Sequence, residues 1–300
     1  MAVVTDNLLA QGLKSIQADI DAAFDSLLPV PEDPRARLFE AMRYAVIGGG
    51  KRVRPLLVAA VAEMYGVDRN AAVRVGAAIE SVHVYSLIHD DLPCMDNDAL
   101  RHGKPTLHLA FDEATAVLAG DALQCFAFEL LADVATSGDP FVRVELVTTL
   151  ATASGHNGMA GGQMMDIAAE TASFDLATVT RLQQLKTGAL LGAAVELGAI
   201  LGKVPPEGRR HLRAYARDIG LAFQIVDDLL DHEGDAALAG KALRKDAEAG
   251  KETFVSLLGA ERAREQARLL IDQAIAHLAS HGPEADLLRA LARFIVERDR

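Results

Sequence analysis

The chain has 300 residues, half of them hydrophobic, so it can bury a large core and is not disordered as a whole. Its 42 acidic and 30 basic residues give a net charge of -12, which opposes a broad electrostatic attraction to nucleic acid or to an anionic membrane surface. Only two cysteines occur, Cys94 and Cys125, without metal or redox spacing. We therefore expect a reducing compartment and interpret both as packing residues.

The N-terminal segment MAVVTDNLLAQGLKSIQADI lacks a basic region followed by a continuous apolar run, which secretory signals have. No later stretch contains roughly 18 uninterrupted apolar residues. These two features predict a cytoplasmic protein without a membrane span.

Apolar residues recur every three or four positions along most of the chain, whereas alternating apolar and polar residues are scarce. This pattern predicts an all-α protein of about a dozen helices. Asp33-Pro34 and Asp139-Pro140 are typical of helix starts, and Gly66 and Gly202 of helix stops. No Pro/Ser-rich linker or repeat divides the chain, so we expect one domain over residues 1–300.

The segment GGGKRVRP, residues 48 to 55, directly precedes a helix that we expect to begin near Pro55. Glycines such as Gly50 allow close approach of the backbone to a ligand, and helix N-termini attract anions. Lys51, Arg52 and Arg54 add three positive charges. The segment predicts an anion site, although it is not a Walker loop and a solvated basic turn is the alternative.

A first acidic cluster, HDDLPCMDND at residues 89 to 98, ends a predicted helix that starts near Asn70. Pro93 disfavours helical backbone at the preceding residue, which places Asp90 and Asp91 in the last turn. There they face the negative end of the helix dipole, and at ~4 Å they repel each other by about 4 kcal/mol at an effective dielectric constant of 20. The cluster is either a solvated turn or a cation site.

One face of the same predicted helix carries His83, Ser86 and Asp90, whereas its surroundings are apolar. A half-buried carboxylate pair requires cations. Oxygen-only ligands suit a hard cation, and magnesium usually brings phosphate oxygens with it. The cluster therefore favours a magnesium and phosphate site.

Lys186-Thr187-Gly188 interrupts a later helical pattern. Gly188 is either a plain helix stop or part of a break that leaves the Thr187 carbonyl free to face a positive centre. Lys186 would then meet a phosphate from the same break.

A second acidic cluster, VDDLLD at residues 226 to 231, ends a helix predicted from Pro206 to about Asp231. That helix has a single apolar stripe, formed by Leu212, Tyr215, Ile219, Phe223, Val226 and Leu230. Gln224, Asp227 and Asp231 share an arc beside the stripe, whereas Asp228 points further round. Two such clusters predict carboxylates that face each other across a helical core and hold magnesium.

The glycine-punctuated, charged stretch of residues 232 to 253 follows the second cluster. Its composition predicts a mobile segment that closes as a lid and excludes water. Lys241, Lys245 and Lys251 in this stretch, and Arg101 after the first cluster, are further cations for a phosphate.

In combination and in order, these motifs resemble the short-chain trans-polyprenyl diphosphate synthase family, most closely its bacterial farnesyl diphosphate synthases. The resemblance rests on GGGKRVRP, HVYSLIHDDLPCMD, GMAGGQMMD (158 to 166), KTG, FQIVDDLLD and GKET, and extends to the terminal FIVERDR. It implies an all-α, single large helical bundle domain of the isoprenoid synthase type, with a central cavity between two aspartate-rich helices. It also implies a cytoplasmic homodimer.

The resemblance implies a role for each matching position. Asp90, Asp91 and Asp96, with Asp227, Asp228 and Asp231, match ligands of about three magnesium ions and the allylic diphosphate. The isopentenyl diphosphate positions match Gly50, Lys51, Arg54 and His83, and the allylic substrate positions match Arg101, Lys186, Thr187, Gln224 and Lys241. Lys251 matches a further basic residue near that diphosphate, and Tyr85, with its neighbour Ser86, matches the positions that limit chain length.

One position departs from the family pattern, because Arg101-His102 stands where two arginines are usual. The second arginine normally helps to hold isopentenyl diphosphate. The departure predicts weaker or pH-dependent binding of that substrate.

The charges indicate the reaction class. Cleavage of an allylic carbon–oxygen bond leaves diphosphate and a delocalised cation, so the site stabilises a departing anion with magnesium, Lys186, Lys241 and Arg101. The Thr187 carbonyl and the Gln224 oxygen face the cation. The double bond of isopentenyl diphosphate then attacks, and a proton is lost to the departing diphosphate.

Tyr85 and the two extra residues between the aspartates of the first cluster are typical of bacterial enzymes that stop at fifteen carbons. Tyr85 is otherwise a plain core aromatic. A geranylgeranyl diphosphate synthase of the same family is the main alternative.

Other classes fit less well. A phosphohydrolase of the HD type needs histidine ligands upstream of His83, and residues 1 to 82 contain none. A terpene cyclase does not need a second diphosphate site at Lys51 and Arg54. A non-catalytic partner subunit tends to lose an aspartate cluster, and both are intact.

Overall fold

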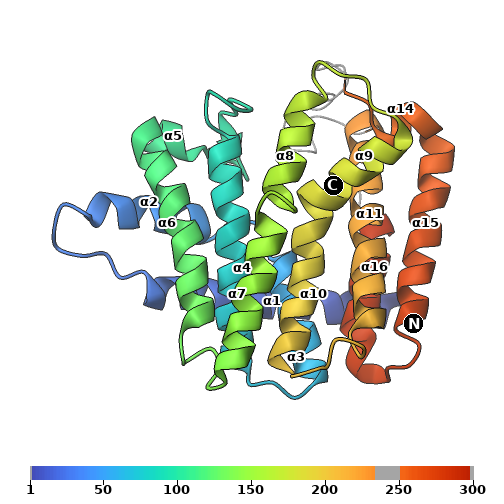
Figure 1. Ribbon diagram of the computed structural model, residues 1–300, viewed down its shortest axis with the longest axis horizontal. Helices are drawn as coiled ribbons and strands as arrows, with labels where there is room; N and C mark the ends of the chain where they lie inside the picture. The colour runs from blue at the N-terminus through green and yellow to red at the C-terminus, as the bar shows by residue number, and fades with distance from the viewer. Residues whose placement is uncertain (1, 234–250, 298–300) are drawn as a thin grey trace.

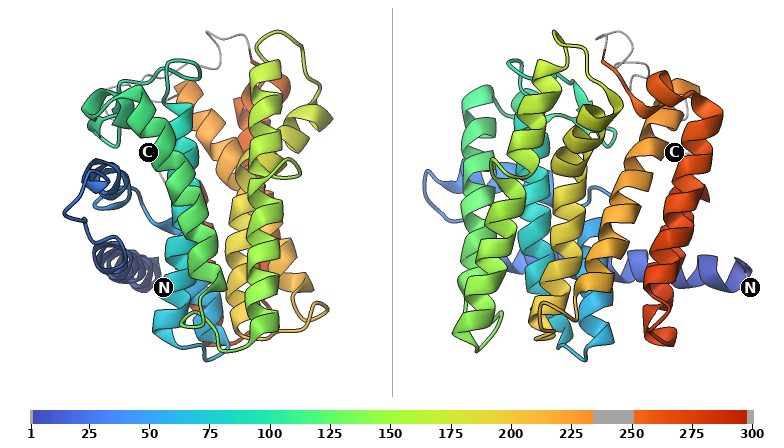
Figure 2. Two further views of the ribbon diagram at one scale, coloured as in Figure 1. Left: turned by 60° about the vertical axis from the view of Figure 1, so that its left-hand side comes forward. Right: turned by 45° about the vertical axis from the view of Figure 1, so that its right-hand side comes forward.

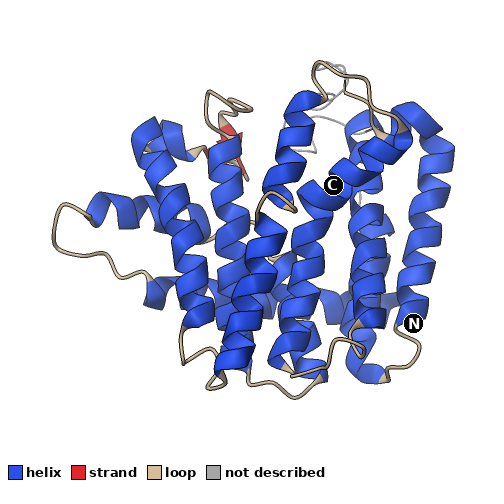
Figure 3. Cartoon of the chain, viewed as in Figure 1, coloured by secondary structure: helices blue, strands red, loops and turns tan. Residues whose placement is uncertain are grey.

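The prediction of an all-α protein is confirmed by a computed structural model that describes residues 2–233 and 251–297 (Figures 1 and 3). The first half of the described chain contains α1 (Ala2–Leu27), α2 (Ala36–Val46), α3 (Val53–Met64), α4 (Arg69–Asp90), β1 (Leu100–Arg101), β2 (Lys104–Pro105), α5 (Leu107–Ala110), α6 (Glu113–Ala132) and α7 (Pro140–Ser154). The second contains α8 (Met159–Ala168), α9 (Leu176–Gln183), the π-helix η1 (Gln184–Gly188), α10 (Ala189–Leu201), α11 (Arg210–Glu233), α14 (Phe254–Leu258), α15 (Ala260–His277), the 3-10 helix η2 (Pro283–Ala285) and α16 (Asp286–Glu297).

Helix α4 lies in the centre of the bundle and packs against α1, α3, α6 and α10. It is apolar on several faces, which suits a helix that other helices surround. Its N-terminus is capped by Asp68, whose carboxylate accepts the Asn70 N–H at 2.9 Å. The observed bounds agree with the predicted ones to about one residue, so α4 presents Asp90 at its end.

Helix α11 begins at Arg210, not at Pro206 as predicted, because a turn occupies the residues before it. The predicted apolar stripe is otherwise confirmed, since Leu212, Tyr215 and Ile219 are buried. The Tyr215 hydroxyl donates to the Leu288 carbonyl of α16 at 2.8 Å, which satisfies its one buried polar group. This stripe holds α11 in register with α15 and α16.

Most of the predicted helix ends are confirmed. Asp139 caps α7 through the Phe141 N–H, with proline at the first position, and Gly66 and Gly202 follow α3 and α10. The predicted start at Asp33-Pro34 is wrong, because α2 begins at Ala36. There the Asp33 carboxylate accepts the Arg35 N–H at 2.8 Å and forms a turn ahead of the helix.

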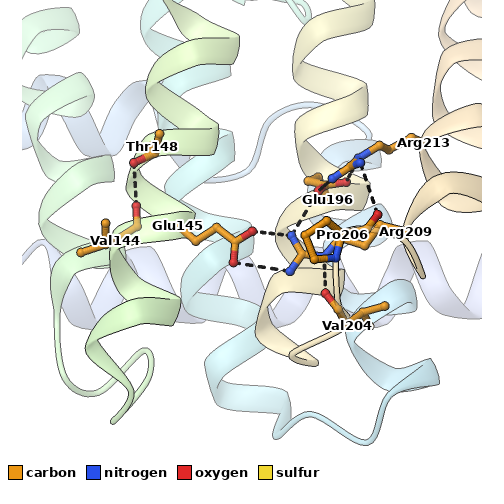
Figure 4. A network of polar contacts seen from close by, with 8 residues as sticks. All are labelled: Val144, Glu145, Thr148, Glu196, Val204, Pro206, Arg209 and Arg213. Atoms are coloured by element: carbon orange, nitrogen blue, oxygen red, sulfur yellow. Dashed lines mark hydrogen bonds and ion pairs between the residues drawn. The ribbon is translucent and has the colours of Figure 1, made fainter.

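A buried arginine joins α7, α10 and the start of α11 at the lower end of the bundle (Figure 4). Arg209 is 3% exposed, and its guanidinium donates to Glu145 at 2.6 Å, to Glu196 at 3.2 Å and to the Val204 carbonyl. Glu196 also accepts from Arg213 at 2.6 Å. A guanidinium with this many partners tolerates burial, so the network fixes the end of the bundle opposite the aspartate clusters.

Helix α1 crosses the other helices instead of running along them, behind them in the view of Figure 1 (Figures 1 and 2), and it packs against α3, α4 and α16. By length and mean hydropathy, three stretches of the described chain are apolar enough to cross a membrane, although none is an uninterrupted apolar run. They are Arg69–Asp90, Glu113–Ala132 and Leu176–Leu201. The buried share is 72% for the first and 39% for the second, so packing accounts for α4, whereas α6 leaves apolar surface uncovered.

Both cysteines are exposed, so their interpretation as packing residues is wrong. Cys94 lies in the loop of the first acidic cluster, and Cys125 lies on α6. Leu118 on α6, Val134 after its end and Phe141 on α7 are exposed as well. Exposed apolar side chains of this size are typical of a contact surface.

Candidate active site

The two acidic clusters lie at the same end of the bundle, because α4 and α11 both end at the top of the view in Figure 1. The π-helix η1 lies near both of them. Lys186 of η1 acts electrostatically on Asp90, and the Thr187 hydroxyl is 3.2 Å from the Gln224 side-chain oxygen of α11. The structure therefore brings the predicted acidic and basic residues of three elements together.

The carboxylates of the first cluster differ in their partners. Asp91 is 3% exposed and accepts hydrogen bonds from Arg101, whose Nε is 3.1 Å from Asp91 Oδ1. Burial raises the pKa of Asp90 to about 6, although the charge of Lys186 opposes this. Burial also raises the pKa of Asp91, and the Arg101 hydrogen bond only partly offsets it. Asp90 and Asp91 thus lie in an environment that disfavours their ionised form, and a bound cation would stabilise that form.

A short β-hairpin, which the sequence analysis missed, places Arg101 beside Asp91. Strands β1 and β2 pair Arg101 with Lys104, and the two residues between them, His102 and Gly103, have φ of 52° and 76°. Positive φ at both central residues is the mark of a type I′ turn. The dipeptide His102-Gly103 was the available signal, since histidine tolerates this backbone better than most residues.

The aspartates of the second cluster have different partners, because Asp228 is bonded within the protein whereas Asp227 lies near Arg54. Asp228 is 4% exposed, and its two oxygens accept from Gln224 Nε2 at 3.1 Å and from the Phe254 N–H at 2.9 Å. Asp227 faces Arg54 closely enough to act on its pKa, which burial lowers and the charges of Glu80 and Asp227 raise. Asp231 is partly exposed one turn further on.

A cavity of about 430 Å³ lies between α2, α3, α4 and the hairpin. Its walls contain all of the predicted isopentenyl diphosphate residues, Asp91 and Arg101, and several apolar side chains. The residues concerned are Gly50, Lys51, Arg54, His83, Asp91, Arg101, His102, Leu191, Phe223 and Phe294. A cavity lined by both positive and apolar groups fits a diphosphate ester with a hydrocarbon part.

Arg52 is not a free phosphate-binding charge, which corrects its reading as one of three available cations. Its guanidinium is 2% exposed and donates to Glu80 at 2.8 Å and to Asp21 at 2.9 Å. Its backbone lies in the left-handed region with φ 53°, next to Gly50 with φ 71°. Arg52 instead fixes the shape of the segment that presents Lys51 and Arg54.

His83 is kept neutral near this cavity. Burial and the charge of Arg54 lower its pKa well below the ordinary histidine value. A neutral imidazole still donates one hydrogen bond to a phosphate oxygen. Ser86 donates its hydroxyl to the His83 carbonyl at 2.8 Å.

Tyr85 is 9% exposed and lies edge-on to His89, with 5.8 Å between the ring centres. Burial raises its pKa, so the phenol stays neutral. Both rings belong to the last two turns of α4, on the side that packs against α6.

The helix does not stop at Gly188, and this corrects the plain-stop reading. It continues from α9 through the π-helix η1 into α10, and a single π-turn of this kind frequently marks a functional site. A Cβ at Gly162 of α8 would lie 2.2 Å from the Lys186 backbone nitrogen. Glycine therefore lets α8 approach the π-helix closely, which sequence periodicity does not reveal.

Lys251 begins the second described range and lies in the extended segment that precedes α14. Its Nζ is 2.9 Å from Asp166 Oδ2, and the same oxygen is 2.9 Å from Lys186 Nζ. The sequence analysis quoted Asp166 within GMAGGQMMD but gave it no role. Lys241, Lys245 and most of the predicted lid lie outside the described residues.

Within residues 2–233 and 251–297, no three His, Cys, Asp or Glu side chains converge tightly enough to hold a metal ion by themselves. Magnesium is usually held by one or two carboxylates together with water and substrate phosphate oxygens. Asp90, with its raised pKa, and Asp227 offer such partial ligand sets. The donor chemistry thus fits magnesium that arrives with a diphosphate.

Comparisons with known proteins agree with this geometry. Residues 35–291 match the profile of the polyprenyl synthetase family. Farnesyl diphosphate synthase of Escherichia coli is 46% identical over 287 residues, covering 92% of this chain and 93% of that protein. A chloroplastic geranylgeranyl pyrophosphate synthase of Catharanthus roseus is 46% identical over 266 residues, covering 88% and 74%. The crystal structure of an FPP/GFPP synthase from Zymomonas mobilis is similar with a TM-score of 0.87 and 59% identity, over 99% of this chain and 100% of that one.

Proposed function

Because this chain belongs to the polyprenyl synthetase family, we propose that it condenses isopentenyl diphosphate with dimethylallyl and geranyl diphosphate to give farnesyl diphosphate. It is a prenyl-transferring enzyme of isoprenoid biosynthesis. The observation that carries the proposal is the convergence of α4, η1 and α11, which combines two carboxylate clusters with Lys186 and Arg101 beside a partly apolar cavity.

Members of the family use Mg²⁺. Asp90, Asp91 and Asp96 on one side, and Asp227, Asp228 and Asp231 on the other, would hold about three ions between them. When bound, these ions neutralise the carboxylates and the diphosphate and make the diphosphate a better leaving group. Asp228 already has two donors in this structure, so the proposal assigns the stronger ligand roles to Asp90 and Asp227.

Lys186, Lys251 and Arg101 stabilise the departing diphosphate. As the allylic carbon–oxygen bond breaks, both bonding electrons pass to the diphosphate oxygen, and nearby ammonium and guanidinium groups lower the energy of that charge. Lys241, outside the described residues, is assigned to the same task.

The allylic cation that remains needs oxygen dipoles near it and little water. The Thr187 hydroxyl donates to the Gln224 oxygen at 3.2 Å, which fixes that amide and leaves its second lone pair free to face the cation. The isopentenyl double bond then forms the new carbon–carbon bond. The departing diphosphate takes the proton that restores the double bond, since no described side chain is placed as a dedicated base.

Isopentenyl diphosphate is proposed to bind in the cavity of about 430 Å³, through Lys51, Arg54, His83 and His102. Arg54 is held by the charges of Glu80 and Asp227 at the edge of this cavity. The hydrocarbon part then lies against Phe223, between the two diphosphate sites. This arrangement brings the nucleophilic double bond toward α11 and η1.

Tyr85 does not line the cavity of about 430 Å³, and it is proposed to limit the space that the growing chain enters beyond it. It is large, buried and braced by His89, so it can block extension beyond fifteen carbons. The similar synthase from Zymomonas mobilis is named for two products, FPP and GFPP. The chain length of the product therefore has to be measured for this protein.

We also propose a cytoplasmic homodimer. The support for a dimer is the exposed apolar surface of α6, α7 and their connection, where Phe141 is 83% exposed and Leu118 58% exposed. A second copy that covered this surface would remove these side chains from water.

Incubation with labelled isopentenyl diphosphate, each allylic primer and magnesium tests the proposed function. Chromatography of the dephosphorylated products should show farnesol. Geranylgeraniol as the main product would favour the longer-chain alternative, and release of phosphate without chain growth would favour a hydrolase.

A further inference from the structure

A single carboxylate oxygen joins two lysines at the centre of the site. Asp166 Oδ2, on α8, is 2.9 Å from Lys186 Nζ of η1 and 2.9 Å from Lys251 Nζ, which precedes α14. The Asp166 side chain is 16% exposed, so this contact is largely shielded from water. The three residues come from separate parts of the chain, and no local sequence pattern brings them together.

The backbone that carries Lys251 is fixed independently of this contact. The neighbouring Glu252 carboxylate accepts from the Ser173 hydroxyl and from the Phe174 N–H at 3.1 Å. The Phe254 N–H donates to Asp228 at 2.9 Å. Lys251 therefore starts from a fixed Cα, and only its side chain remains to be placed.

Lys186 is equally constrained at its backbone. The close approach of α8 at Gly162 fixes the position of the Lys186 backbone within the π-helix. Asp166 lies on α8 one turn after Gly162. Its carboxylate accepts a hydrogen bond from Lys186, the residue whose backbone Gly162 contacts. Both lysines thus reach Asp166 from backbones that other contacts hold.

The charge balance shows what the carboxylate contributes. Two ammonium groups repel each other, and the long lysine side chains would separate in water without a shared anion. Burial of Asp166 raises its pKa, but the charges and hydrogen bonds of Lys186 and Lys251 outweigh this, and the pKa lies below the ordinary value. Asp166 therefore stays ionised, and the three groups together keep one net positive charge.

We propose that Asp166 is a positioning residue that gathers Lys186 and Lys251 into one two-cation site for the departing diphosphate. This inference rests on the proposed function and deepens it. Lys186 lies close enough to Asp90 to act on its charge, so a diphosphate bound at the first cluster meets both ammonium groups. Asp166 acts through the lysines and does not touch the reacting atoms.

The test is Asp166→Asn, which keeps the side-chain shape and removes the charge. We expect kcat/KM for geranyl diphosphate to fall by about 10²-fold, as for other misplaced catalytic groups, whereas the KM for isopentenyl diphosphate changes by less than about twofold. Glu170→Gln is the matched control, because Glu170 also faces Lys251, but at 3.5 Å and with 53% exposure. It should keep nearly the wild-type rate.

A double-mutant cycle with Lys251→Met separates positioning from a general loss of structure. If Asp166 acts through the lysines, Asp166→Asn should cost clearly less in the Lys251→Met background than in the wild type. Should Asp166→Asn fold poorly, Asp166→Glu and Asp166→Gln form a second pair of equal size, and only the charged one should retain activity.

Two outcomes would overturn the inference. An unchanged kcat/KM for geranyl diphosphate in folded Asp166→Asn would mean that Lys186 and Lys251 adopt their positions without the Asp166 charge. A lower KM for geranyl diphosphate would mean that Asp166 competes with the diphosphate for the lysines. Either result with active wild-type enzyme leaves the proposed function intact, whereas inactive wild type with both primers contradicts the function itself.

Discussion

Arg101 holds Asp91 through two nitrogens, with 3.1 Å between Arg101 Nε and Asp91 Oδ1. Asp91 is almost fully buried, and Arg101 lies directly before the tight turn at His102-Gly103. The hairpin therefore couples a predicted diphosphate ligand to a predicted metal ligand before any substrate binds. This coupling orients the guanidinium toward the first cluster.

Arg101→Lys should lower kcat/KM for the allylic diphosphate while leaving the KM for isopentenyl diphosphate nearly unchanged. Lysine keeps the charge but cannot make the paired contact, and hydrogen bonds to charged groups contribute about 1.5 to 3 kcal/mol, which predicts a loss of about 10- to 100-fold. Steady-state kinetics with each substrate varied in turn checks this. Arg35→Lys, at an exposed pair with Asp33, is the control.

His102 predicts how isopentenyl diphosphate binding depends on pH. Desolvation and the charge of Arg101 lower the pKa of His102, so the imidazole is neutral at pH 7 to 8 and gains its charge only below the ordinary value of about 6.5. Wild-type KM for isopentenyl diphosphate should therefore be flat from about pH 7 to 8 and should fall as pH decreases further.

His102→Arg should lower that KM across the whole pH range and remove the acid-side decrease. The ratio of wild-type to variant KM cancels the titration of the substrate itself. A small loss of stability, about 1 kcal/mol, is expected because arginine fits the left-handed backbone of this turn less well than histidine. A constant ratio from about pH 5.5 to 8 would rule out His102 as a contact.

Gly162→Ala should impair both folding and catalysis. The added methyl would meet the Lys186 backbone at 2.2 Å, so α8 and η1 must separate, at a cost of about 1 to 3 kcal/mol. Gly192→Ala on α10 is a matched control, because nothing lies within 4 Å of the added methyl and removing a helix glycine stabilises by about 0.5 to 1 kcal/mol. Urea unfolding and kcat measured on both proteins check the contrast.

Tyr85→Ala should lengthen the product. Removing the ring opens space beside His89, and the chain can then extend past fifteen carbons. The variant loses about 3 kcal/mol of stability, so products are compared per folded protein. Tyr65→Ala, which removes a ring that packs on His281 instead, should leave the farnesyl product unchanged. If Tyr85→Ala gives the wild-type product profile, Tyr85 is a core residue and not the floor of the cavity.

The sequence predicted the parts of the fold that depend on local patterns. The ends of α4 and the stripe of α11 follow from periodicity and capping, which act within a few residues. Of the two readings of Gly188, the plain helix stop was wrong, because the helix continues through the π-helix η1 into α10. Its close contact with α8 at Gly162, more than twenty residues away, has no local signal. The hairpin at His102-Gly103 had a local signal that was not used.

Within the site, residue types were predictable but their partners were not. Arg52 looked like a third phosphate ligand, yet Asp21 and Glu80, distant in the sequence, neutralise it. Asp166 stood within the quoted motif GMAGGQMMD, but the motif gave it no role, because that role depends on two lysines from other elements. Long-range ion pairs of this kind become visible only when the chain is folded.

The most direct test of the account is calorimetric titration with a thio-analogue of geranyl diphosphate that resists cleavage. Wild-type protein should bind it only when Mg²⁺ is present, and both Asp90→Asn and Asp227→Asn should weaken that binding by at least about tenfold, since each removes a proposed ligand from one of the two aspartate clusters. Equal binding in the presence of a chelator, or weakening by one of the two substitutions alone, would contradict a shared metal and diphosphate site between α4 and α11.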